Sequence, residues 1–207
     1  MIICLFGPDG SGKTTIAREL ERSLNDRFRV KVSWVRGTHT LASLVARFLS
    51  NFSVFRGSGN IYYRISIPRG GRKVWQFLEF ISFLPVLFVR FYVPSLLGYL
   101  VIAERYVPDF VVWVVVTTDD SSYLSSIVAR FLLALTLRTR IRIYVRADLQ
   151  KLLERRSDMD PYFIKKEFVI YERLAKSMGS FVLDTTSKSV DESLRVILAF
   201  VDQNLNV

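Results

Sequence analysis

A run of small residues with one lysine and two threonines, GPDGSGKTT, occupies residues 7–15. Residues 7–14 fit the spacing G-x-x-x-x-G-K-[ST] without a gap. Glycines at this spacing let the backbone curl so that several N–H groups face one point, where phosphate oxygens bind. The lysine supplies charge to the β- and γ-phosphates, and the Thr14 hydroxyl is placed to coordinate Mg²⁺. The predicted phosphate-binding residues are Gly7, Pro8, Asp9, Gly10, Ser11, Gly12, Lys13, Thr14 and Thr15.

The sequence on either side of this phosphate loop (residues 7–14) has the pattern that such a loop requires. Residues 2–6 are continuously apolar, which predicts a strand buried on both faces. Residues 14–24 carry apolar side chains at helical spacing, so we expect a helix whose N-terminus adds N–H donors and a positive dipole. The strand–loop–helix order favours a nucleoside triphosphate site over a glycine turn without a ligand.

Short apolar runs alternate with longer amphipathic runs along the rest of the chain. Further strands are predicted at 30–35, 99–103, 141–145 and 180–184, and further helices at 38–49, 121–137, 148–156 and beyond Ser189. Ser189 and Glu192 have the spacing of a capping box. Residues 110–118 fit either a strand or a buried helix, and the segment 51–72 reads as a surface loop. This alternation predicts a single α/β domain over 1–207 with a parallel sheet.

Composition limits the classes of protein to which the chain can belong. Half of its 207 residues are hydrophobic and 14% are aromatic, which is typical of a folded domain. Lys and Arg exceed Asp and Glu by 29 to 19, a net charge of +10 that favours nucleotides, nucleic acid or an acidic membrane as partners. One cysteine, Cys4, and one histidine, His39, exclude a disulfide framework and a Cys/His metal cluster. A strand-like start that leads directly into the glycine loop does not resemble a signal peptide, so we expect a cytoplasmic protein.

Residues 74–103 are strongly apolar, but Glu79, Pro85, Arg90 and Pro94 interrupt them. The longest uncharged run, 91–103, has 13 residues, fewer than the roughly 18 to 20 that span a bilayer. We expect a helix buried in the core or against another subunit, and interfacial membrane binding is the alternative.

Four segments in order resemble the thymidylate kinases, over nearly the whole chain. Asp9 stands where their loop reads G-x-D-x-x-G-K-[ST]-T, and VIAERY at 101–106 resembles a strand that ends in an Asp-Arg-Tyr type motif. Residues 141–156 resemble the fourth strand and the helix leading to the lid, and 180–193 the fifth strand, adenine loop and final helix. The resemblance implies a P-loop NTPase fold: a three-layer α/β/α sandwich, a five-stranded parallel sheet of order 2-3-1-4-5, and a short lid near 154–163.

The same resemblance implies an activity and partners. We expect ATP- and Mg²⁺-dependent phosphoryl transfer to a nucleoside monophosphate, with dTMP as the first candidate. The alternatives are a kinase for another small metabolite, or a nucleotide-binding protein with little kinase activity. Thymidylate kinases are typically homodimers, so the apolar helix at 74–97 is expected to pair with its copy rather than with a membrane. Nucleic acid is not expected as a partner, because the chain contains no RNA- or DNA-binding motif.

The resemblance also assigns roles to single residues. Glu104, at the Asp position of Asp-Arg-Tyr, would act with Thr14 on Mg²⁺, and Arg105 would hold acceptor phosphate. In this family an arginine can follow the loop aspartate; Gly10 stands there, so the lid arginines would supply the charge. The expected catalytic residues are Lys13, Arg105, Arg155 and Arg156, and the expected acceptor-binding residues are Asp9, Arg36, Phe80 and Arg105. Arg36 could instead be a solvated loop arginine, and Arg155 and Arg156 a solvated helix end paired with Glu154 and Asp158.

One departure concerns the acceptor. The family places a thymine-reading arginine on the helix before the Asp-Arg-Tyr motif, and counting back from Glu104 puts Phe83 in that slot. Phe77 or Phe80 could stack on a base, and Arg90 is the arginine that could replace the missing donor. A site without that donor should discriminate poorly among bases.

Overall fold

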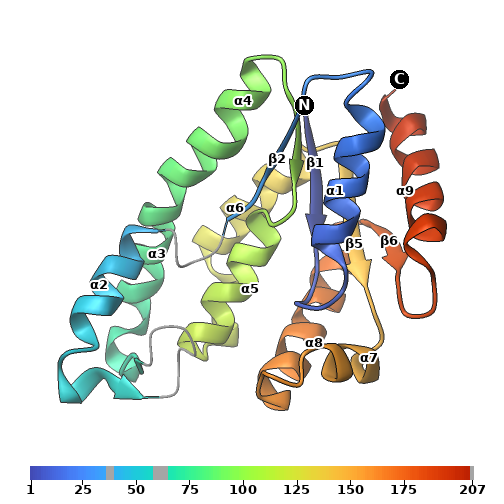
Figure 1. The fold of residues 1–207 in the computed structure, drawn as a ribbon. Helices are drawn as coiled ribbons and strands as arrows, with labels where there is room; N and C mark the ends of the chain where they lie inside the picture. Colours follow the sequence, from blue (N-terminus) through green and yellow to red (C-terminus); the bar gives the residue numbers. More distant parts are fainter. Residues whose placement is uncertain (36–39, 58–64, 206–207) are drawn as a thin grey trace.

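The computed structural model describes residues 1–35, 40–57 and 65–205 (Figure 1). Arg36 and His39 lie outside the described residues. The strands are β1 (Ile2–Phe6), β2 (Val30–Ser33), β4 (Leu100–Ala103), β5 (Ile141–Arg146) and β6 (Phe181–Asp184). The helices are α1 (Lys13–Leu24), α2 (Leu41–Leu49), α3 (Arg72–Leu87), α4 (Val93–Leu96), α5 (Val107–Thr118), α6 (Ile127–Leu137), α7 (Leu149–Arg155), α8 (Pro161–Ser177) and α9 (Val190–Leu205).

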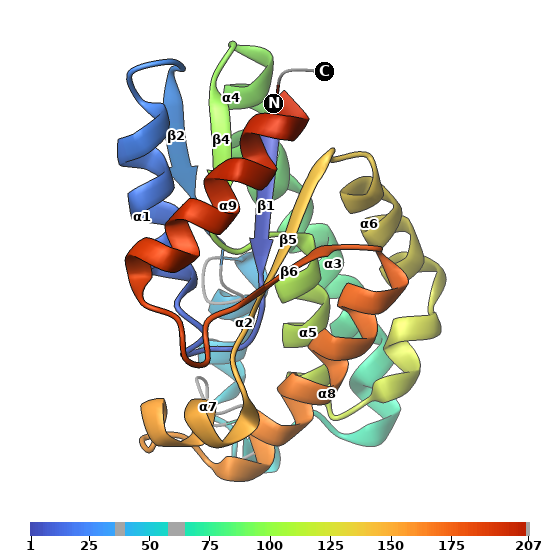
Figure 2. The ribbon, with the colours of Figure 1, turned by 90° about the vertical axis from the view of Figure 1, so that its right-hand side faces the viewer.

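The five strands form one parallel sheet in the order β2-β4-β1-β5-β6. Counting only these strands along the chain, they are the second, third, first, fourth and fifth. Helices α1 and α9 cover one face, while α5 and α8 cover the other, with α3 beyond α5 (Figures 1 and 2). Ile3 and Leu5 of β1 point to the first layer, and Cys4 and Phe6 to the second. Both faces of β1 are therefore buried, which explains its continuous apolar run and confirms the expected α/β/α fold class.

Residues 110–118, which fitted either element, belong to helix α5. All of them except Trp113 are buried, because α5 lies on the sheet with α8 beside it and also packs against α3 and α6 (Figures 1 and 2). A helix buried all round loses the apolar periodicity that would have marked it. The single helix expected at 121–137 is divided at Ser126, whose hydroxyl accepts a hydrogen bond from the Ala129 N–H (3.1 Å) and so caps α6.

The apolar region before β4 is a nearly continuous helix made of α3, a π-helical turn at Phe88–Tyr92 and α4. Pro85 lies inside α3, where it has no N–H to donate, and the wide turn follows directly. By length and composition alone, the described helix Arg69–Leu96 could cross a membrane. A third of its most apolar stretch is buried within the protein.

The segment expected as a surface loop at 51–72 is partly packed. Arg56 and Ile65 form an isolated antiparallel bridge, and Ile65 is fully buried against Ala42, Ala46 and Trp75. This small cluster joins the segment to α2 and α3.

Candidate active site

The phosphate loop connects β1 to α1 at the carboxyl end of the central strand, where open α/β sheets bind ligands. Gly7, Gly10 and Gly12 have φ angles of 149°, 89° and 94°, which favour glycine. A Cβ at Gly7 would lie 2.3 Å from the carbonyl oxygen of Val145 in β5. The first glycine is therefore required by the close approach of two strands as well as by its backbone angle.

Lys13 lies over the loop rather than in solvent. Its Nζ donates hydrogen bonds to the carbonyl oxygens of Gly7 (2.5 Å) and Pro8 (2.8 Å), and the side chain is buried. Burial, followed by the charge of Arg105, lowers the pKa of Lys13 to about 8, although Asp9 and Asp109 act in the opposite direction. These carbonyl contacts hold a positive charge where phosphate oxygens would bind.

Asp9 is held between two arginines that are distant from it in sequence. Arg105, which follows β4, pairs with its Oδ1, and Arg156, which follows α7, donates from Nη1 to its Oδ2 (3.1 Å). Burial opposes the charge of Arg105, yet Asp9 and Asp109 raise its pKa overall. Arg156 also forms a two-pronged ion pair with Asp158 (2.9 and 3.1 Å). The fold thus brings together Asp9, Arg105 and Arg156, three of the residues selected from the sequence.

Thr14 and Glu104, the expected Mg²⁺ pair, are also in contact, because the Thr14 hydroxyl donates to Glu104 Oε1. A hydroxyl and a carboxylate beside a phosphate loop fit Mg²⁺, which binds oxygen and keeps several waters. Within the described part of the chain, no group of three or more His, Cys, Asp or Glu side chains could hold a metal ion. Thr14 and Glu104 therefore suit a metal ion that would take its remaining ligands from phosphate oxygens and water.

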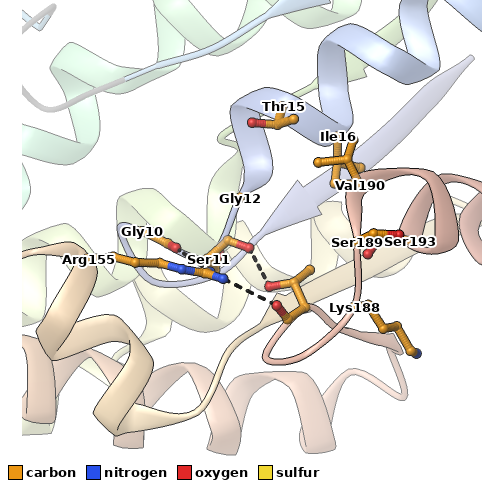
Figure 3. A pocket seen from close by; sticks show the side chains of 11 residues that line it. Gly10, Ser11, Gly12, Thr15, Ile16, Arg155, Lys188, Ser189, Val190 and Ser193 are labelled. Carbon is orange, nitrogen blue, oxygen red and sulfur yellow. Dashed lines mark hydrogen bonds between the residues drawn. The ribbon is translucent and has the colours of Figure 1, made fainter.

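Arg155 lies against the loop beside Gly10 (Figure 3). It donates to the carbonyl oxygens of Gly10 (3.0 Å) and Thr185 (3.4 Å), and the Thr185 hydroxyl donates to the Ser11 carbonyl (2.8 Å). These contacts border a cavity of about 270 Å³ between the loop, α1 and the start of α9. Thr15, Lys188 and Ser193 are among the other residues that line it. The cavity adjoins the loop at Gly10, Ser11 and Gly12, and Asp9 is not among the residues that line it.

The remaining acceptor predictions fall elsewhere in the structure. Phe83 is fully buried and stacks on Phe110 of α5, with ring centroids 3.9 Å apart. Phe80 makes its ring contacts with Phe77 and Phe131. Arg90 donates to the carbonyl oxygen of Trp34 beyond β2 (2.8 Å).

Three residues near the loop were not selected from the sequence: Asp109, Glu167 and Tyr171. Asp109 and Tyr171 are buried, and Asp109 accepts hydrogen bonds from Gly7 N (3.4 Å) and Tyr171 OH (3.0 Å). Burial, followed by the charge of Asp9, raises the pKa of Glu167 to about 7. Glu167 and Tyr171 are four residues apart on α8, a helix that the sequence reading did not identify. Helical spacing of polar residues in 161–177 was the signal that could have revealed them.

Comparison with known proteins supports the fold but not a specific member of a family. No protein-family model and no curated protein sequence matches the chain. Among solved structures, the chain resembles a thymidylate kinase from Candida albicans, whose structure was reported to reveal the origin of broad substrate specificity and a novel structural element. The TM-score is 0.68 at 15% identity, over 100% of this chain and 92% of that one. The chain therefore has a thymidylate kinase-like P-loop fold, and its resemblance to that enzyme is one of structure.

Proposed function

We propose that the chain is an ATP-dependent phosphotransferase that uses Mg²⁺ and transfers a phosphoryl group to a nucleoside monophosphate. The observation that carries this proposal is the convergence of Lys13, Arg105 and Arg156 around Asp9 at the phosphate loop. Phosphoryl transfer needs positioning and charge neutralisation more than covalent chemistry, and this set of cations supports both. Location in the cytoplasm and a single domain over 1–207 remain predictions from the sequence.

Each residue has a separate task in the proposed reaction. Lys13 and the loop N–H groups bind the donor phosphates, and Thr14 and Glu104 hold Mg²⁺, which when bound neutralises phosphate charge. Arg105 binds the acceptor phosphate, and Asp9 faces the acceptor. Arg155 and Arg156 approach the loop from the proposed lid at 154–163 and stabilise charge on the group in transfer. The acceptor attacks in line, and no covalent intermediate with the protein forms.

The acceptor is the part of the proposal with two candidates. The fold favours dTMP as the first to test, because the structural neighbour is a thymidylate kinase. The Phe83–Phe110 stack favours another small phosphorylated or hydroxylated metabolite, since a buried ring cannot donate a hydrogen bond to a base. The roles proposed for Arg36 and Phe80 in acceptor binding are untested.

A coupled assay of ADP release decides between these candidates. Purified protein, ATP and Mg²⁺ are supplied with each nucleoside monophosphate in turn, and release that depends on dTMP supports the first. Arg156→Ala should reduce transfer by roughly 100-fold or more, because it removes a charged donor from the transition state. Arg22→Ala is the matched control, since Arg22 is exposed on α1 and pairs with Glu19. If ATP binds but no monophosphate is phosphorylated, the chain is not a nucleoside monophosphate kinase.

We also infer that the chain forms a homodimer through the apolar helix. Val74, Phe77, Ile81 and Phe88 of this helix are exposed and recur at intervals of three, four and seven residues, as in a helix–helix seam. Ile81→Glu should convert a dimer to a monomer in sedimentation velocity, because it places a charge in the seam. Val169→Glu, on the exposed side of α8, should leave the dimer intact. A parent protein that sediments as a monomer at all concentrations would refute the dimer.

A further inference from the structure

A carboxylate lies directly under the phosphate loop without taking part in the reaction proposed above. Asp109, in the first turn of α5, is 6% exposed. Its Oδ1 accepts hydrogen bonds from Gly7 N (3.4 Å) and from the Tyr171 hydroxyl (3.0 Å), and its Oδ2 accepts from Tyr106 N (3.1 Å). One carboxylate therefore joins the loop, its own helix and α8.

The surroundings of Asp109 make these three hydrogen bonds obligatory. The carboxylate is buried on the same side of the sheet as the apolar residues Cys4 and Phe6, where an unpaired charge would be strongly destabilising. Tyr171 is 3% exposed, and its ring packs on Phe6 and Tyr144 at centroid distances of 6.4 Å each. That packing fixes the position from which its hydroxyl can donate.

Gly7 needs an external constraint because glycine has the widest choice of backbone angles. The Gly7 N–H donates a hydrogen bond to Asp109, and the Gly7 carbonyl oxygen accepts a hydrogen bond from the Lys13 ammonium group. We propose that Asp109, oriented by Tyr171, is a positioning residue for the phosphate loop: it fixes Gly7 and thereby the first turn of the phosphate cradle. Its effect on ATP binding rests on the proposed function, whereas the constraint on Gly7 does not.

Two variants alter the hydrogen bond between Tyr171 and Asp109, one at the donor and one at the acceptor. Tyr171→Phe keeps the packed ring and deletes the hydroxyl. Asp109→Asn keeps the shape, but its amide nitrogen must face either the Tyr106 N–H or the Gly7 and Tyr171 donors, so at least one hydrogen bond is lost. Tyr144→Phe is the matched control: this buried tyrosine packs on the same rings, and its hydroxyl donates to Glu172 (3.1 Å) rather than to Asp109.

The first measurement needs no ligand. In protein labelled with ¹⁵N-glycine, the Gly7 amide proton should move upfield in Asp109→Asn and Tyr171→Phe, because its charge-assisted hydrogen bond weakens. Its exchange with solvent should be about tenfold faster, in line with the loss of a hydrogen bond to a charged group. Tyr144→Phe should change neither. An unmoved Gly7 signal in both variants, or an equal change in the control, would overturn the proposal.

The second measurement is ATP binding by calorimetry. The Kd for ATP should rise about tenfold in each single variant and no further in the double variant, because both act through one contact. Additive effects in the double variant would contradict the proposal. If the parent protein does not bind ATP, the proposed function fails, and the Gly7 amide still decides whether Asp109 positions the loop.

Discussion

Charged side chains from several segments converge around the phosphate loop, whereas stacked aromatic rings fill the space between α3 and α5. On the loop side, Lys13 donates to the carbonyl oxygen of Pro8, and the next residue, Asp9, pairs with Arg156. On the α3 side, Phe83 and Phe110 are stacked and buried, and Glu79, one turn before Phe83 on α3, is fully buried. Under the proposed function, the loop binds phosphate, a group common to all nucleotides, and so a local motif predicts it. Acceptor choice depends on side chains from separate helices, and no motif records it.

The largest effect is expected at the loop itself. Lys13→Ala removes the buried ammonium, so transfer should fall by about 1,000-fold. The measurement is the ADP-release assay together with ATP binding by calorimetry. Lys151→Ala, which loses only an ion pair with Glu154 on α7, should be close to the parent. Undiminished activity in Lys13→Ala would mean that donor phosphates bind elsewhere.

Phe83→Ala should affect folding rather than catalysis. The ring is fully buried and stacked, so its loss should reduce the free energy of unfolding by about 3 to 5 kcal/mol. Urea denaturation measures this change, and the ATP affinity of the folded fraction should stay the same. Phe131→Ala, half exposed on α6 and outside the proposed dimer seam, serves as the control with a much smaller change. A Phe83 variant with normal stability but altered acceptor KM would make Phe83 a substrate contact.

Glu79 gives the α3 side a pH dependence. Burial raises the pKa of Glu79 from 4.5 to about 7, although hydrogen bonds from Trp113, Thr40 and Trp75 act in the opposite direction. Tyr123 also faces the Glu79 carboxylate. Between these pH values, Glu79 is protonated in the folded protein and ionised in the unfolded chain. The contribution of Glu79 to the free energy of unfolding is therefore fully present below pH 4.5. That contribution falls as pH rises through 7.

Glu79→Gln should remove this dependence. Relative to the parent, the variant should gain stability as pH rises, by up to roughly 3 kcal/mol at pH 9, since each pKa unit corresponds to about 1.4 kcal/mol. Urea denaturation at pH 5, 7 and 9 measures the trend. Glu154→Gln, at an exposed site on α7, should show no such trend. A constant difference between Glu79→Gln and the parent across these pH values would contradict the assignment.

The smallest effect is expected at Ser189, which precedes α9 and lines the cavity beside the phosphate loop. Ser189 and Glu192 form the capping box predicted from their spacing, with Glu192 N donating to Ser189 Oγ (3.2 Å) and Ser189 N to Glu192 Oε2 (2.8 Å). Ser189→Ala should destabilise the protein by about 1 kcal/mol. Thermal unfolding measures this, and Ser187→Ala is the nearby control. No loss of stability would mean that α9 does not depend on its cap.

Local patterns were sufficient for the parts of the fold in which neighbouring residues decide the outcome. The β1–loop–α1 unit, the strands of the sheet and the Ser189 cap were all predicted within a few residues. Helix α5 was ambiguous because burial on every side removed its periodicity. Asp109, Glu167 and Tyr171 come to the loop only through the packing of α5 and α8 on the sheet. Such neighbours depend on the three-dimensional arrangement, which a single sequence does not display.

The position of Asp9 between Arg105 and Arg156 has a consequence for selectivity by charge. Both guanidinium groups already have a carboxylate partner within the protein. Under the proposed function, an arriving acceptor must displace that carboxylate or share the arginines with it. A phosphate monoester, with up to two negative charges and three oxygens, should compete with one carboxylate better than a neutral hydroxyl compound does. Asp9 would therefore act as an internal competitor that sets a minimum charge for entry.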